Sequence, residues 1–320
     1  MKRPSTRRSP PESDARDLAH ALAPREGYNL TALADVRVLR SDRPLSDTPV
    51  LYDPGLVIVL QGAKRGFFGE EVIDYDQDHY LAVAAPVPFT MQSDGSLEQP
   101  LLALYLHLDF QLAAELLIEL DRAGGEAPGD SARSLVSSPM DPDMRQSVRR
   151  LLQVLSRPLE AAVLGRALVR ELYFRVLTGP QGQSLRAALT QQGQFGKVGK
   201  VGKALRRIHR DYADRLDLGM LAREAGMSVP SFHVHFKAVT QSTPMQYLKS
   251  TGLHQARLLM AREGMTAAAA CHAVGYESSS QFNREFKRLF GLTPGAEARR
   301  MKASFDIPPA LPGAGFVSSH

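Results

Sequence analysis

The chain has 320 residues, 43% hydrophobic and 23% charged, with a net charge of +5, which is the composition of an ordinary globular protein. This length favours two domains, and the most apolar run, residues 101–108, is far too short to cross a bilayer. A single cysteine, Cys271, excludes an internal disulfide framework and a zinc site built from several cysteines. No apolar segment follows the charged N-terminus, so we expect a cytoplasmic protein with no membrane partner.

Positive charge is concentrated near the C-terminus. Residues 196–302 hold 18 Lys and Arg against 8 Asp and Glu, a net +10, whereas residues 1–195 hold 21 against 25, a net −4. This asymmetry predicts a polyanion-binding module attached to a module with another task. A solvated charged face is the alternative.

The N-terminal half begins with a polar segment and continues with short runs that are typical of β-strands. Residues 1–16 mix basic residues with proline and serine, which predicts a disordered tail. The tail either has no function or contacts DNA non-specifically. Between residues 36 and 109, short apolar and aromatic runs alternate with turn signals such as Gly69-Glu70. The runs are residues 56–60, 65–68, 71–74, 79–84 and 101–109. Their close spacing predicts a sandwich or small barrel.

Two histidines in this region, His79 and His107, are weighed as metal ligands. They stand 28 residues apart with no His-x-His pair, and alternation along residues 101–109 places His107 on the face of Tyr105. A half-buried structural histidine, an effector-pocket histidine and a metal ligand are the three interpretations of His107. No acid–base pair, phosphate loop or activated nucleophile has a suitable spacing, so no enzymatic activity, metal or cofactor is predicted.

Three helices are predicted after the β region, at residues 111–122, 142–156 and 159–178. The third carries a leucine stripe at Leu164, Leu168 and Leu172, which either closes the domain's own core or pairs with a second copy of the chain. We expect a homodimer formed through this half. Residues 181–202, rich in Gln and Gly and containing the near-repeat GKVGKVGK, are predicted to be a linker without compact structure.

The C-terminal part contains two similar helix-turn-helix units. The second spans residues 267–294, with a small-residue helix, a Gly-Tyr-Glu-Ser turn and a helix whose Phe282 and Phe286 share one face. Fifty positions earlier the same pattern recurs, with Phe232 and Phe236 in the equivalent places. Cys271 occupies the slot of Ala222 in the first unit, so a packed helix position is favoured over a redox role. Two units in register are a strong signal for DNA binding.

The motif at residues 274–294, VGYESSSQFNREFKRLFGLTP, resembles the signature of the AraC/XylS family of bacterial transcription regulators. The resemblance covers about residues 197–302 and implies two helix-turn-helix units joined by a long helix, each placing its second helix in a major groove of DNA. Residues 52–83 are similar to the cupin-like barrel of one AraC-type subfamily, which implies a sensor and dimerisation domain. The expected fold is therefore a cupin-like β barrel with helices, followed by an all-α double helix-turn-helix domain.

These observations predict a domain order and a set of site residues. The expected segments are a tail at 1–16, a sensor domain at 17–180, a linker at 181–202, a DNA-binding domain at 203–302 and a second disordered tail at 303–320. The expected DNA-contacting residues are Pro230, Ser231, His233, Val234, Ser279, Ser280, Gln281, Asn283, Arg284 and Lys287. The expected effector-pocket residues are Val57, Val59, Phe67, Tyr80, Tyr105 and His107.

The two units are not expected to read DNA equally. Family positions that touch bases map onto Pro230, His233 and Val234, and Val234 can offer only apolar contact to a thymine methyl group. Gln281, Asn283 and Arg284 can make bidentate contacts to bases. A connecting helix over residues 245–262 would be roughly 27 Å long, close to the roughly 34 Å between successive major grooves on one face of DNA.

The function predicted from these features is transcription regulation. Its expected partners are double-stranded DNA, RNA polymerase, a small-molecule effector and a second copy of the chain. Two alternatives stay open: an architectural DNA binder whose N-terminal domain only oligomerises, and a DNA-repair enzyme fused to AraC-type units. The position of Cys271 inside a helix-turn-helix unit argues against the repair enzyme.

Overall fold

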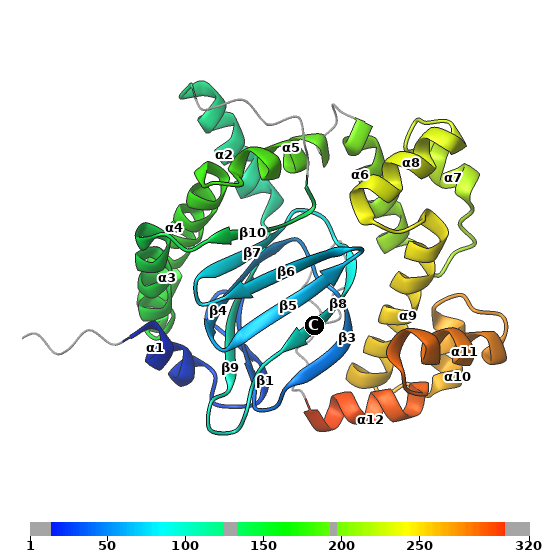
Figure 1. Cartoon of the computed structure of the whole chain (residues 1–320), viewed down its shortest axis with the longest axis horizontal. Helices are drawn as coiled ribbons and strands as arrows, with labels where there is room; N and C mark the ends of the chain where they lie inside the picture. The colour runs from blue at the N-terminus through cyan, green and yellow to red at the C-terminus, as the bar shows by residue number, and fades with distance from the viewer. Residues whose placement is uncertain (1–13, 125–132, 193–196, 305–320) are drawn as a thin grey trace, which may run out of the picture.

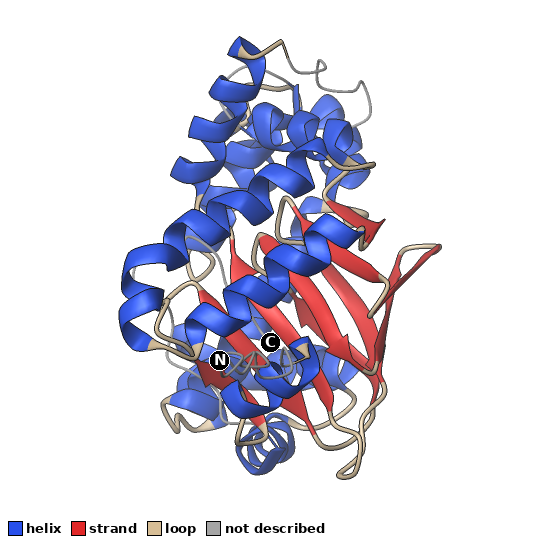
Figure 2. Cartoon of the chain, turned by 90° about the vertical axis from the view of Figure 1, so that its left-hand side faces the viewer, coloured by secondary structure: helices blue, strands red, loops and turns tan. Residues whose placement is uncertain are grey.

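Two β-sheets packed face to face form the centre of the N-terminal half, and a helical C-terminal half lies beside them (Figure 1). The computed structural model describes residues 14–124, 133–192 and 197–304. Helices cover the outer face of one sheet, as the view from that side shows (Figure 2). Both expected tails lie mainly outside the described residues, although α1 begins at Ala15 and α12 ends at Ser304.

The larger sheet has the strand order β1-β2-β9-β4-β7-β10, and the smaller has the order β3-β8-β5-β6. All the pairings are antiparallel, and the two sheets do not close into a barrel, which corrects that detail of the cupin-like expectation. The strands are β1 Gly27–Leu30, β2 Val36–Ser41, β3 Leu45–Leu51, β4 Gly55–Gln61, β5 Ala63–Phe68, β6 Glu71–Asp76, β7 His79–Val83, β8 Pro88–Ser93, β9 Leu101–His107 and β10 Leu135–Pro139.

The central strand β9 shows how the sequence builds two cores. Successive side chains of a strand point to opposite faces. Leu102, Leu104 and Leu106 therefore lie in the core between the larger sheet and the helices, while Leu101 and Ala103 lie in the core between the two sheets. Because both faces are covered, the strand is apolar at almost every position, and this alternation was predicted from the sequence.

The helices of the N-terminal half are α1 Ala15–Leu22, α2 Phe110–Arg122, α3 Pro142–Leu155, α4 Pro158–Thr178 and α5 Gly182–Gln192. The expected leucine stripe on α4 proves to be mainly internal. Leu168 and Leu172 are buried in the core against the larger sheet, whereas Leu164 is exposed. Two of the three stripe residues thus close the domain's own core, the first of the two interpretations.

The segment expected to be a linker is mostly helical. Helix α5 ends at Gln192, and α6 Lys197–Arg210 begins with KVGKVGK, residues 197–203 of the near-repeat. Glycine disfavours a helix by about 1 kcal/mol, but Val201, Leu205 and Ile208 recur at helical spacing and are fully or almost fully buried. Burial of this stripe outweighs the low helix propensity of the glycines.

The C-terminal half contains the two expected helix-turn-helix units, each with its own core. The first unit has α7 Leu218–Glu224 and α8 Val229–Thr240, and the second has α10 Ala267–Ala273 and α11 Ser279–Phe290. Helix α9 Pro244–Arg262 connects them, and α12 Pro294–Ser304 packs on α9. Cys271 is fully buried in the second core, the packed position that the sequence favoured.

Helix α9 also joins the C-terminal half to the β-sandwich. The hydroxyl of Tyr247 donates to the carbonyl oxygen of Pro86 at 2.9 Å, and Nη1 of Arg257 donates to that of Pro49 at 3.2 Å. Leu258 of α9 also packs against Leu51 of β3. Helix α9, which sets the separation of the two units, is therefore also the helix that contacts the β-sandwich.

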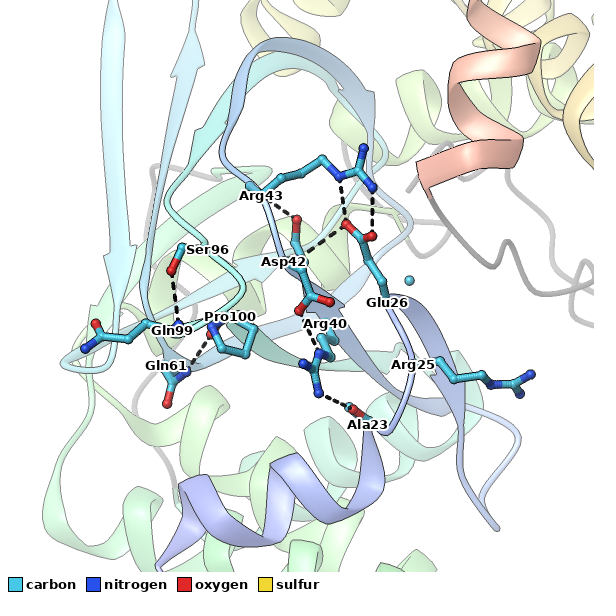
Figure 3. Close-up of polar contacts among 12 residues, drawn as sticks. Ala23, Arg25, Glu26, Arg40, Asp42, Arg43, Gln61, Ser96, Gln99 and Pro100 are labelled. Carbon is cyan, nitrogen blue, oxygen red and sulfur yellow. Dashed lines mark hydrogen bonds and ion pairs between the residues drawn. The ribbon is translucent and has the colours of Figure 1, made fainter.

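Polar contacts at one end of the sandwich fix the start of the domain (Figure 3). Glu26, just before β1, accepts two hydrogen bonds from Arg43, at 2.9 and 2.8 Å, in the turn that follows β2. Arg40 pairs with Asp42 at 2.7 Å, and the amide of Gln61 donates to the carbonyl of Pro100 at 2.7 Å. The side chain of Arg43 is 46% exposed, and exposed ion pairs contribute about 0–1 kcal/mol each, so its pair with Glu26 orients the two segments more than it stabilises the fold.

Candidate DNA interface and ligand pocket

Helix α11 is the better equipped of the two reader helices. Phe282 and Phe286 are fully buried and fix the helix against its unit. Every residue predicted to contact DNA from this helix is exposed: Ser279, Ser280, Gln281, Asn283, Arg284 and Lys287. The helix begins where the Ser278 hydroxyl accepts a hydrogen bond from the backbone of Gln281, at 3.3 Å. A buried aromatic face and an opposite polar, basic face are what a helix needs to enter a major groove.

Helix α8 of the first unit has the same anchoring with a less polar surface. Phe232 and Phe236 are fully buried, and Val234 is 66% exposed. Pro230 is exposed as well, while Ser231 and His233 are half-buried. Ser228 occupies the expected position before the helix, but its side chain forms no capping hydrogen bond. The outer face of α8 thus offers few groups that could distinguish one base pair from another.

Glu285 is the centre of a polar network on α11. It accepts hydrogen bonds from the Lys249 ammonium at 2.9 Å, the Tyr276 hydroxyl at 2.7 Å and the Gln281 amide at 3.1 Å. Burial acts to raise the pKa of Glu285, but these three hydrogen bonds outweigh it and hold the pKa below its usual value. The network ties the reader helix to α9 and holds the Gln281 side chain in place.

The loop between α6 and α7 reaches across to the turn of the second unit. Arg215 forms an ion pair with Glu277, and Ala213 lies directly against Gly275. Gly275 has a φ of +81°, which favours glycine. The two units are therefore in contact through this loop as well as through α9, which restricts how far one reader helix can turn relative to the other.

A narrow pocket lies at one end of the space between the sheets, with a volume of about 40 Å³. This volume holds about three water molecules, well below the roughly 300 Å³ of a typical ligand site, so a larger molecule requires the pocket to open. Three tyrosines form much of its wall: Tyr28, Tyr52 and Tyr105. Asp35, Arg37, Asp53 and His107 supply the charged and polar groups.

The structure brings only part of the predicted effector-pocket set together. Val57, Tyr105 and His107 line the pocket, and Val59 belongs to the same core between the sheets. Tyr80 lies in the other core, on the helix side of the larger sheet. Phe67 shares the outer face of β5 with exposed Arg65, because Lys64 and Phe68 alternate with them toward the inside.

The two histidines lie in different surroundings. Nδ1 of His79 is 3.1 Å from Oδ1 of Asp76 at the start of β7, whereas Nδ1 of His107 is 3.8 Å from Oδ2 of Asp53 at the pocket. Burial lowers the pKa of His107, which favours the neutral ring at neutral pH. Within the three described ranges, no group of three or more His, Cys, Asp or Glu side chains is arranged to hold a metal ion.

Sequence reasoning missed two residues that the structure makes prominent, Glu285 and Lys64. The spacing of Gln281 and Glu285, four residues apart on one helix, is a local signal for the first. Lys64 is buried between the sheets, and its position in β5 alternates with exposed Arg65. The alternation of inward and outward side chains could be predicted from the sequence of β5. The sequence could not predict which face of this strand the other sheet covers.

The family follows from comparison with known proteins. Residues 32–184 match the family described as "AraC-type transcriptional regulator N-terminus", and residues 221–300 match a helix-turn-helix domain family. The chain belongs to the AraC-type transcriptional regulators. These proteins regulate transcription and bind DNA through helix-turn-helix units. In the part of this chain that the structure describes, no helix is long and apolar enough to cross a membrane.

Similar proteins include transcription regulators from other bacteria. The chain is 24% identical over 250 residues to the virulence regulon transcriptional activator VirF of Yersinia enterocolitica, covering 78% of this chain and 89% of VirF. It is 25% identical over 195 residues to the regulator ExsA of Pseudomonas aeruginosa, covering 61% of this chain and 66% of ExsA. Wild-type ToxT from Vibrio cholerae strain SCE256, solved with a bound unsaturated fatty acid, has a TM-score of 0.57 at 9% identity over 88% of this chain and 99% of ToxT.

Proposed function

We propose that this AraC-type regulator recognises a specific DNA sequence by docking α8 and α11 into successive major grooves. The observation that carries the proposal is the pair of reader helices, each anchored by two fully buried phenylalanines and exposed on its opposite face. Helix α9 has 19 residues and is therefore about 28 Å long, close to the spacing of about 34 Å between grooves. The net charge of +10 over residues 196–302 supports binding to phosphates.

Specificity should come mainly from α11. Arg284→Ala is expected to weaken binding to the cognate site by about 1–3 kcal/mol, because an exposed arginine can contact two acceptors of guanine. Val234→Ala on α8 should cost less, since valine contributes only apolar contact. Gel-shift titrations of both variants on cognate and scrambled DNA measure this. A larger loss for Val234→Ala than for Arg284→Ala would reverse the assignment of the two units.

A small molecule bound in the sandwich is proposed to control DNA binding. The pocket with Val57, Tyr105 and His107 is the proposed site, and the ligand bound to ToxT supports a sensing role for a domain of this fold. The contacts of α9 with Pro49 and Pro86 supply a path, because movement of the sandwich would move the helix that separates the units. An effector can change DNA affinity only by binding the two arrangements with different free energies.

The remaining features of the proposal concern assembly and cellular setting. We place the protein in the cytoplasm with RNA polymerase as a partner at the promoter. The sensor domain is proposed at 17–180. The DNA-binding domain, expected at 203–302, is extended to the start of α6 at Lys197, because the buried Val201, Leu205 and Ile208 of this helix lie in the core of the first unit.

A homodimer through α4 is part of the proposal. Leu159, Val163 and Phe174 recur at helical spacing on the exposed face of this helix, and Leu159 and Val163 are 80% and 70% exposed. The double change Leu159→Asp with Val163→Asp should convert the dimer to a monomer, because it would bury charge at the contact. Sedimentation velocity on the full chain measures this. Val72→Asp, on β6, is the control, and wild type that sediments as a monomer at tens of micromolar would contradict the dimer.

A further inference from the structure

Lys64 is a lysine buried between two β-sheets. Its position in β5 points inward, and the residue is 2% exposed. Within the described ranges no carboxylate forms an ion pair with it; its partners are tyrosines. Residues 1–196 contain 19 arginines but only two lysines, Lys2 and Lys64. A chain that uses arginine for nearly every cation of this half has a lysine at this buried position between the sheets.

Tyrosines surround the Lys64 amine. Its Nζ donates hydrogen bonds to the hydroxyls of Tyr105, at 2.7 Å, and Tyr52, at 3.1 Å. The same nitrogen lies 5.3 and 5.6 Å from the centres of those two rings. The Tyr105 hydroxyl donates to that of Tyr52 at 3.2 Å, and the Tyr52 and Tyr75 hydroxyls are 3.3 Å apart. The amine thus has proton-carrying hydroxyls in direct contact with it.

This arrangement favours an uncharged amine. Burial without a carboxylate disfavours the ammonium form and lowers the pKa of Lys64 to about 7. Lysine can lose its proton in such a site, whereas arginine cannot, and a neutral amine in an apolar site is a nucleophile. An apolar residue of similar length would fill the space without the penalty of burying a charge. The lysine is therefore costly for stability, which points to a role in function.

The lysine lies behind the wall of the pocket. Tyr52 and Tyr105, which hold its Nζ, both line the pocket. The pocket also has two carboxylates, Asp35 and Asp53, against one guanidinium, Arg37. This excess of negative charge disfavours the binding of an anion at the pocket lining. It is compatible with the binding of a small uncharged molecule. Movement of the two tyrosine rings would connect the pocket with the amine.

We propose that Lys64 binds a carbonyl-bearing effector, an aldehyde or ketone, as a reversible imine. The amine nitrogen attacks the carbonyl carbon, the carbonyl oxygen takes up a proton, and the resulting carbinolamine loses water as the carbon–nitrogen double bond forms. The Tyr105 hydroxyl is placed to give a proton to the departing hydroxyl group and to recover one from the nitrogen. One amine and one carbonyl give one imine and one water, with no oxidant or reductant. This inference rests on the proposed sensing role of the same pocket.

The test traps the imine on the full chain at pH 7. Propanal, chosen for its small size, is added with sodium cyanoborohydride, which reduces an imine to a stable secondary amine, and the labelled lysines are located by peptide mass spectrometry. We expect labelling of Lys64 to exceed that of exposed Lys237 by about tenfold or more, because an ordinary lysine of pKa about 10.4 is almost fully protonated at pH 7. Labelling confined to exposed lysines and the N-terminus would overturn the proposal.

Two controls separate this inference from others. Lys64→Met should abolish the labelling at position 64 and melt at a higher temperature than wild type, while Lys237→Met should leave the labelling of Lys64 unchanged. Propanoate, which lacks an electrophilic carbonyl, should not raise the melting temperature of wild type. If propanoate stabilises wild type but not Lys64→Met, and propanal gives no label, Lys64 is an anion site and the imine is wrong. Failure of wild type to bind DNA would instead contradict the proposed function.

Discussion

Glu297→Gln is expected to lower the free energy of unfolding by about 3–5 kcal/mol, because it leaves the buried guanidinium of Arg257 without a counter-charge. The two side chains are 4% and 0% exposed, with Nε of Arg257 2.8 Å from Oε1 of Glu297. Burial lowers the pKa of Arg257 to about 10, which still leaves the side chain charged at neutral pH. The variant would therefore keep the buried charge of Arg257 and lose the attraction to Glu297 that offsets the cost of burying that charge.

The matched control for Glu297→Gln removes an exposed partner of the same carboxylate. Arg300 also contacts Glu297, at 2.8 Å, but its side chain is 40% exposed, so Arg300→Gln should cost about 1 kcal/mol or less. Chemical denaturation of the full chain, followed by circular dichroism, measures both. Equal losses for the two variants would show that the pair of Arg257 and Glu297 contributes no more than a surface ion pair.

Gly275→Ala should be nearly as damaging. A Cβ at this position would lie 2.3 Å from the carbonyl oxygen of Ala213, a backbone atom that cannot move aside without shifting the loop between α6 and α7. The positive φ of +81° adds strain for any residue with a side chain. Overpacking and backbone strain together predict a loss of about 2–5 kcal/mol in the free energy of unfolding.

The first unit provides the control for Gly275→Ala. Gly226 occupies the equivalent turn with a φ of +57°, but no atom lies within 4 Å of a Cβ built there. Gly226→Ala should therefore cost only the backbone strain, about 1–2 kcal/mol. Thermal unfolding of both variants tests the difference. If Gly226→Ala were as destabilising as Gly275→Ala, the contact between the loop and the second turn would have no energetic weight.

The sequence predicted the C-terminal half in detail because its signals are local. Phe232 and Phe236, like Phe282 and Phe286, recur at helical spacing after a turn glycine, and all four are fully buried. In the N-terminal half the apolar strands β4, β5, β6, β7 and β9 were predicted. Strands β1, β2, β3, β8 and β10 were missed. Of these, β3 and β10 carry Ser, Asp, Thr and Pro, and in β3 the register shifts between Leu45 and Thr48.

The errors have a common physical cause in tertiary contacts. The repeat GKVGKVGK was interpreted as a linker from its glycines, but Val201 is fully buried against the first unit. The stripe on α4 was a candidate partner surface, yet the larger sheet already covers Leu168 and Leu172. The pocket set mixed residues from two cores, because a strand pattern defines two faces without saying what each face meets.

Selection of binding sites from random duplex DNA by the full-length protein tests the central claim most directly. Two reader helices held by α9 and by the loop at Gly275 should enrich a motif with two blocks whose centres are about 10 base pairs apart, one turn of the double helix. The block read by α11 should be the more constrained, because that helix exposes Gln281, Asn283 and Arg284. Enrichment of a single block, or of sequences no more alike than the starting library, would contradict recognition by two docked units.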